Sequence, residues 1–162
     1  MSLLEHAPQL SQDQAIGFAR ALYGIRAQVR LLPSERDQNF LLETEAGEKF
    51  VFKIANAMED RSLLEAQNLA MAQVNTTLPV CSRVMPTLAG ELIAEIQLPA
   101  GAKHFGRLVT YLPGVPLGEV RRQSSDLLHS LGKRVGQVDR ALADFEHPAL
   151  QRDFQWDLVN AL

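Results

Sequence analysis

The sequence is poor in several features that would point to a particular class of protein. Among its 162 residues Cys81 is the one cysteine, so we expect neither a disulfide framework nor a cysteine-rich metal site, and a cytoplasmic protein fits this composition. The formal net charge is −3, which leaves no electrostatic footprint for nucleic acid or an anionic membrane. Apolar runs stay shorter than the ~18 residues of a membrane span. The first residues, MSLLEHAPQL, lack the basic start and long apolar stretch of a signal peptide.

The rest of the composition is that of an ordinary globular protein. Apolar residues make up 46% and charged residues 22% of the chain, which is enough to bury a core without disulfides. The length suits one domain, or one domain and part of another. We therefore expect a cytoplasmic globular chain that has neither nucleic acid nor membrane as a partner.

Strands follow from alternating or β-branched runs and the turn residues between them. Residues 26–32 alternate, and Pro33 ends that run. The stretch NFLLETEAGEKFVFKIA predicts two strands around a turn at 45–48. Residues 81–98 indicate a further hairpin around Ala89-Gly90, and FGRLVTYLPG is a very apolar last strand that ends at a Pro-Gly pair.

Helices are expected at three places. Ser11 with Gln14 three residues later forms a capping-box pattern, and that helix should end near Gly24. MEDRSLLEAQNLAMAQV is rich in strong helix formers. From 124 to 145 leucines and valines recur every three or four residues after a serine cap, which indicates a helix with one core-packing face. The order predicts an α+β fold, with an antiparallel sheet covered by a helix and then an all-helical portion.

Two charged residues interrupt apolar segments. Lys53 lies within the strand Phe-Val-Phe-Lys-Ile, and Glu65 lies within the helix that follows. A strand lysine often packs its stem and keeps its ammonium in water. Arg61, one turn before Glu65, offers that carboxylate a surface ion pair. The helix carries apolar stripes on two sides, so its pattern leaves the direction of Glu65 open.

A strand lysine, a glutamate on the next helix and a later strand that runs into a Pro-Gly break form the plan of a kinase small lobe. The segments SERDQNFLLET, KFVFKI, EAQNLAM, GRLVTYLPGVPL, LGKRVGQVDRAL and FQWDL occur here in that order. By these segments the sequence resembles the aminoglycoside phosphotransferase and choline kinase superfamily, and most of all its hydroxylysine-kinase-type members.

The resemblance implies a division of the chain. Residues 1–107 would form a protein-kinase-like small lobe, a five-stranded antiparallel sheet plus a helix. Residues 108–117 would form the hinge, and residues 118–162 the truncated start of the helical large lobe. The cofactors implied are ATP and magnesium. The partners implied are a nucleotide and, in the full-length protein, a small-molecule acceptor whose hydroxyl is phosphorylated, namely an amino alcohol or hydroxylated amine.

The resemblance also implies a set of nucleotide-binding residues. Lys53 would contact the phosphates, and Glu65 would pair with Lys53. A glycine-free loop before the second strand would cover the phosphates, and the end of the last strand would line the adenine hinge. The residues implied for the loop and the hinge are Ser34, Asp37, Asn39, Thr110, Tyr111 and Leu112.

A catalytic loop is what the sequence lacks. None of the four histidines opens a His-x-Asp-x-x-x-x-Asn motif, so we assign no catalytic residue and no metal ligand, and expect the magnesium ligands in a missing large lobe. Asp153 and Asp157 are more typical of capping or surface charge, and Trp156 of a core anchor. A truncated lobe should bind nucleotide weakly, and its uncovered apolar surface favours self-association.

Two other interpretations remain open. The chain could be a non-catalytic kinase-like binding or regulatory module of a larger protein, fused in some relatives to a pyridoxal-phosphate aminotransferase. It could also be a plain α+β interaction domain. The positions of Lys53 and Glu65 relative to the sheet would bear on this choice.

Overall fold

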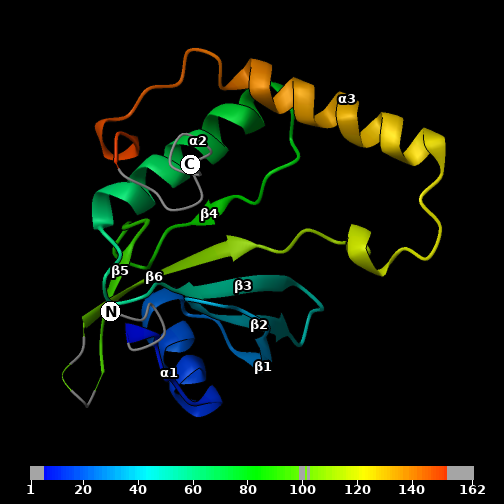
Figure 1. Cartoon of the computed structure of the whole chain (residues 1–162). Coiled ribbons are helices and arrows are strands. Elements are labelled where there is room, and N and C mark those ends of the chain that lie inside the picture. The colour runs from blue at the N-terminus through cyan, green and yellow to red at the C-terminus, as the bar shows by residue number, and fades with distance from the viewer. Residues whose placement is uncertain (1–5, 99–100, 102, 153–162) are drawn as a thin grey trace.

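The computed structural model describes residues 6–98, 101 and 103–152 (Figure 1). In chain order its elements are α1 (Gln12–Tyr23), β1 (Ala27–Leu32), β2 (Gln38–Thr44), β3 (Lys49–Ile54), α2 (Arg61–Thr77), β4 (Val84–Met85), β5 (Ala94–Gln97), β6 (Lys103–Thr110), the 3₁₀ turn η2 (Leu117–Glu119), α3 (Ser125–Ala141) and the 3₁₀ turn η3 (Pro148–Leu150). The strands form one antiparallel sheet in the order β1-β2-β3-β6-β4, with β5 also against β6. Helices α1 and α2 lie on opposite faces of it (Figure 1). The predicted α+β class, an antiparallel sheet covered by a helix and followed by helices, is confirmed.

The sheet has six strands, one more than the five predicted. In the described chain β4 and β5 each pair with the same edge of β6 instead of with each other. The prediction that these two strands form a hairpin around Ala89-Gly90 is therefore wrong. Pro86 directly follows β4 and has no N–H to extend the ladder, which accounts for a strand of only two residues. A turn closed by the Gly90 N–H on the Thr87 carbonyl then leads back toward the sheet.

The main core lies between α1 and one face of the sheet. Ser11 caps α1 through the predicted capping box, and Gly24 ends it at φ +69°. From the sheet, Phe52 is fully buried and meets the ring of Tyr23 edge-on, with the centroids 5.9 Å apart. The other fully or nearly fully buried side chains of this core are Ala15, Ala19, Phe40, Leu42, Ile54, Ile96 and Leu108. This core therefore occupies the face of β2, β3 and β6 that is turned away from α2.

Tyr23 makes the stability of this core sensitive to alkaline pH. Burial raises the pKa of its hydroxyl from 10.0 to about 12. Because the folded chain favours the neutral phenol, its contribution is complete below pH 10 and is lost as the pH rises toward 12. Two pK units correspond to about 2–3 kcal/mol. We expect the unfolding free energy of Tyr23→Phe to fall less than that of the parent chain over this range, measured by urea unfolding at successive pH values.

Tyr111→Phe is the matched control, because Tyr111 is 37% exposed at the end of the sheet. It should keep the alkaline loss of the parent chain. Equal pH profiles for Tyr23→Phe and the parent chain would contradict the prediction.

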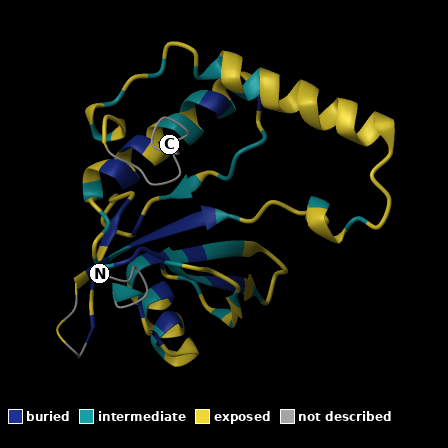
Figure 2. Cartoon of the chain, in the orientation of Figure 1, coloured by how far each residue is buried: buried dark blue, intermediate teal, exposed yellow. Residues whose placement is uncertain are grey.

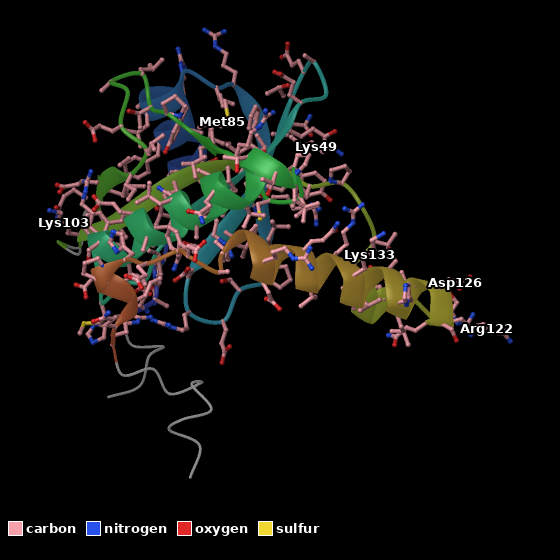
Figure 3. The ribbon with its side chains drawn as sticks, turned by 90° about the horizontal axis from the view of Figure 1, so that it is seen from above. Lys49, Met85, Lys103, Arg122, Asp126 and Lys133 are labelled. Atoms are coloured by element: carbon pink, nitrogen blue, oxygen red, sulfur yellow. The ribbon has the colours of Figure 1, made fainter. Side chains whose placement is uncertain are left out.

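Helices α2 and α3 lie on the other side of the sheet. Leu63, Leu64 and Val74 of α2 are buried, whereas α3 meets α2 near its own end, where Gln73 Nε2 donates to the Ala141 carbonyl at 2.8 Å. The rest of α3 extends past the sheet and is exposed along most of its length (Figures 2 and 3). The exposed apolar residues of α3 are Leu127, Leu128, Leu131 and Val135. The core packing predicted for this stripe is therefore wrong for the described chain, because nothing described covers it.

None of the helices in the described residues is both long enough and apolar enough to span a bilayer.

Candidate nucleotide site

Three polar side chains lie in one row across the centre of the sheet. Asn39 on β2 is the direct cross-strand partner of Lys53 on β3, and Lys53 is the partner of Arg107 on β6. Directly opposed residues of antiparallel strands project from the same face, with Cβ atoms about 4.5–5.5 Å apart. The row lies on the α2 side, because the main core occupies the other face.

An apolar row runs beside the polar one on the same face. Leu41, Val51 and Val109 are direct partners on β2, β3 and β6, and Val84 continues the row on β4. On β2, β3 and β6 the apolar residue is two positions along the strand from the polar row, a distance of about 7 Å. The face therefore presents apolar side chains at the end where β6 leaves the sheet, and cationic side chains further in.

The ammonium of Lys53 is partly withdrawn from water. Burial lowers its pKa, the neighbouring Arg107 cation lowers the pKa further, and the Asp37 carboxylate acts in the opposite direction. Among the described residues no ion pair joins Lys53 to a carboxylate. Asn39 Oδ1, in the same row, is buried without a hydrogen-bond partner in the described chain. The Lys53 ammonium therefore retains capacity to bind an anion, because a half-buried cation is stabilised by countercharge.

Arg107 is the residue that the sequence analysis missed. It is 5% exposed, and its guanidinium donates to α2 at three acceptors: the Leu64 carbonyl at 3.2 Å, Asn68 Oδ1 at 2.7 Å and Gln67 Oε1 at 2.8 Å. The signal was an arginine inside FGRLVTYLPG, the most apolar strand of the chain. A cation in such a strand is costly unless it is hydrogen-bonded, so a partner on the packed helix could have been expected.

The predicted phosphate-covering loop is fastened to the segment between β3 and α2. Asn56 is fully buried; its N–H donates to Asp37 Oδ1 at 3.1 Å and its amide donates to the Arg36 carbonyl at 3.3 Å. Arg36 also pairs with Glu59 at 3.4 Å. These contacts hold Asp37 beside the two cations of the polar row. Ser34 at the other end of the loop is exposed.

Glu65 does not reach Lys53 in this structure. Its carboxylate pairs with Arg61, one turn earlier, at 2.9 Å, which is the alternative that the sequence left open. The face of α2 that meets the sheet is taken by Leu64 and Asn68, and successive helical residues differ by about 100° in direction, so Glu65 points aside. It lines a cavity of about 720 Å³ between α2 and the segments 82–84 and 90–93, and the lining of that cavity does not include Lys53.

The predicted hinge residues follow the apolar row but differ in their contacts. Thr110 is engaged by Arg83, because its N–H donates to the Arg83 carbonyl and its hydroxyl accepts from the Arg83 N–H, both at 2.9 Å. Tyr111 donates its N–H to the Lys49 carbonyl at 3.2 Å. The side chains of Tyr111 and Leu112 are 37% and 49% exposed. The side chains of the two residues after β6 are therefore open to a ligand, whereas Thr110 is hydrogen-bonded to Arg83, the residue before β4.

Metal ligands are not grouped in the part of the chain that the structure describes: no three His, Cys, Asp or Glu side chains there could hold an ion together. Asp153, Trp156 and Asp157 lie outside the described residues.

Comparison with known proteins gives a consistent group of relatives. No family model matches the sequence. Hydroxylysine kinases are similar: that of Danio rerio is 34% identical over 173 residues, covering 99% of this chain and 48% of the relative. That of Xenopus laevis is 32% identical over 175 residues, covering 98% and 46%. The chain thus spans about half the length of the curated relatives that it matches.

Solved structures agree on the fold. An amicoumacin kinase in complex with AMP-PNP and Ca²⁺ superposes with a TM-score of 0.75 at 15% identity, over 92% of this chain and 46% of that one. A microcompartment-associated aminopropanol kinase gives a TM-score of 0.71 at 18% identity, over 94% and 47%.

Proposed function

Because the chain belongs to the aminoglycoside phosphotransferase-like superfamily of kinases, we propose that it provides the ATP-binding part of a small-molecule kinase. The observation that carries this proposal is the pair of parallel rows on the α2 face of the sheet. A nucleotide has an apolar, flat base and an anionic tail, and the two rows offer apolar and cationic surfaces in matching order.

The proposed arrangement places the base at the outer row and the phosphates at the inner one. The purine would lie against Leu41, Val51 and Val109, with its edge toward the backbone of Tyr111 and Leu112. The phosphates would then extend toward Lys53 and Asn39 of the polar row, under the loop that contains Ser34 and Asp37. An anion beside Lys53 supplies the countercharge that its half-buried ammonium lacks, and so would raise the pKa of that lysine upon binding.

The role of Lys53 would be charge neutralisation. In phosphoryl transfer the protein mainly positions the phosphates and stabilises their charge. Magnesium is implied by the family, but the described residues do not provide a ligand set for it, so we assign it no residue and no step here.

For the acceptor we propose a small hydroxylated amine or amino alcohol. The relatives and neighbours named above act on hydroxylysine and on aminopropanol, which both combine a hydroxyl group with an amine. The test is phosphate transfer from ATP to hydroxylysine and to 1-amino-2-propanol by the protein expressed from its own gene. Transfer to either supports the proposal. ATP binding without transfer to any hydroxylated amine would favour the non-catalytic binding module instead.

Nucleotide binding is tested on the chain itself. Calorimetry with ATP, with and without magnesium, should show binding that free phosphate does not reproduce. The absence of any heat or protection from thermal unfolding at millimolar ATP would contradict the proposed site.

Substitution of Glu65 is expected to have only a small effect on stability and on ATP binding. Because the Glu65 carboxylate pairs with Arg61 on an exposed surface, Glu65→Gln should cost about 0.3–0.5 kcal/mol of stability. ATP affinity should stay within about twofold, a difference of about 0.4 kcal/mol, because this carboxylate does not pair with Lys53. Arg61→Gln is the control; it removes the other partner and also the contact of Arg61 with Glu91 at 3.4 Å. A large loss of ATP affinity in Glu65→Gln alone would show that this carboxylate serves Lys53 after all.

A further inference from the structure

We propose that Arg107 is a positioning residue of this site, which fastens α2 to the sheet beside Lys53 and adds the positive charge that governs how Lys53 meets an anion. The inference rests on the proposed nucleotide site for its purpose, but its two physical effects are measurable without nucleotide.

The first effect is mechanical. Arg107 is the cross-strand neighbour of Lys53, and its Nη1 atom donates to both the Leu64 carbonyl and Asn68 Oδ1 while Nη2 reaches Gln67. The three acceptors lie within five consecutive residues of α2, 64–68, so one planar group fixes both the height and the rotation of that helix over the sheet. A lysine at this position would carry the charge, but it would lack the fork of the guanidinium, that is, the two amino groups that donate in one plane to different acceptors.

The second effect is electrostatic. After burial, the Arg107 cation is the largest cause of the lowered pKa of Lys53. Asp37 offsets part of the charge of both residues, and Glu59 and Tyr23 act further on Arg107. On α2 the nearest carboxylate, Glu65, is paired with Arg61. Two adjacent cations with one shared carboxylate leave an excess of positive charge at the inner row.

Two substitutions separate these effects. Arg107→Lys keeps the charge and loses the fork. Arg107→Gln loses the charge and keeps a shorter amide that can still donate to α2. Arg30→Gln is the control, because Arg30 lies on the same face of the sheet, on β1, and is exposed.

Titration of the lysine ammonium groups by NMR of the ¹³C-methylated chain reads the electrostatic effect. The chain has four lysines, and Lys53→Arg identifies the resonance of Lys53. We expect the pKa of Lys53 to be higher in Arg107→Gln than in the parent chain, and to stay low in Arg107→Lys and Arg30→Gln. An unchanged Lys53 titration in Arg107→Gln would overturn the electrostatic part of the proposal.

Hydrogen exchange of the α2 amides reads the mechanical effect. Exchange in residues 64–68 should accelerate in both Arg107 variants, by about tenfold for the loss of one or two charge-assisted hydrogen bonds. It should stay unchanged in Arg30→Gln. Unchanged exchange in Arg107→Lys would overturn the mechanical part, because that variant keeps everything except the fork.

ATP affinity measured in the same variants links Arg107 to the proposed function. Both variants should bind ATP more weakly, and the loss of affinity at alkaline pH should move to higher pH in Arg107→Gln only, a shift that a purely structural role would not produce. If the parent chain fails to bind ATP, the proposed function fails. The titration and exchange measurements would still decide the role of Arg107.

Discussion

Lys53→Met is expected to weaken ATP binding by roughly a hundredfold while leaving the fold intact. The lysine is half-buried and lacks an ion-pair partner in the described chain, so the ammonium is not needed to hold the fold together. A charge-assisted hydrogen bond to phosphate contributes about 1.5–3 kcal/mol, and 2.7 kcal/mol corresponds to a hundredfold ratio. Calorimetric titration with ATP measures the effect.

Lys49→Met is the matched control for this experiment. Lys49 belongs to the same strand and the same face, but it is exposed near the β2–β3 turn, where it pairs with Glu43 at 3.3 Å. It should bind ATP within about twofold of the parent chain, because a surface ion pair contributes little. Equal losses in both variants would mean that general positive charge, not the polar row, attracts the nucleotide.

Gly106→Ala is expected to destabilise the chain by about 1–3 kcal/mol through overpacking. A Cβ atom at this position of β6 would lie 2.5 Å from Ile96 Cδ1 and 3.3 Å from Phe52 Cε2. Both neighbours are fully buried in the main core, so neither can move aside without disturbing the packing under α1. Urea unfolding measures the loss.

A double variant identifies the contact responsible. Ile96→Val removes the nearest methyl group and should cost about 0.5–1.5 kcal/mol on its own. Combined with Gly106→Ala it should destabilise the chain by less than the sum of the two single changes, because the valine leaves room for the new methyl group. Strict additivity would contradict the steric explanation, and an equal cost for Gly118→Ala, in an open turn, would point to backbone freedom instead.

Local signals in the sequence were reliable guides to the fold. The capping box at Ser11, the left-handed Gly24 and the serine cap of the third helix all occur as predicted. The turn at 45–48 also forms, with Gly47 at φ +80°. Each of these depends on residues within four positions of one another, so the sequence alone contains the necessary information.

Features that depend on the register of strands far apart in the sequence were harder to predict. The row that joins Asn39, Lys53 and Arg107 depends on the pairing of β3 with β6 across more than fifty residues of sequence, which no local pattern specifies. The direction of Glu65 was undecided because α2 is apolar on two sides. Hydrogen bonds from Arg107 to Leu64 and Asn68 decide it in the structure.

The apolar stripe of α3 shows the limit of periodicity. The repeat correctly predicted a helix, but it could not say which partner covers the stripe, and the described chain leaves it exposed. Self-association through this surface stays a prediction, as do the bounds of the lobes and the hinge.

The most direct test of the central claim uses an acyl-phosphate derivative of ATP, which transfers its acyl group to a lysine that lies beside the bound phosphates. The chain offers Lys49, Lys53, Lys103 and Lys133, and the lowered pKa of Lys53 favours its reactivity. Mass spectrometry of the labelled peptides should find the group on Lys53, and excess ATP should prevent its transfer. Labelling of the other lysines without Lys53, or labelling of Lys53 that ATP does not suppress, would contradict a phosphate site on this face of the sheet.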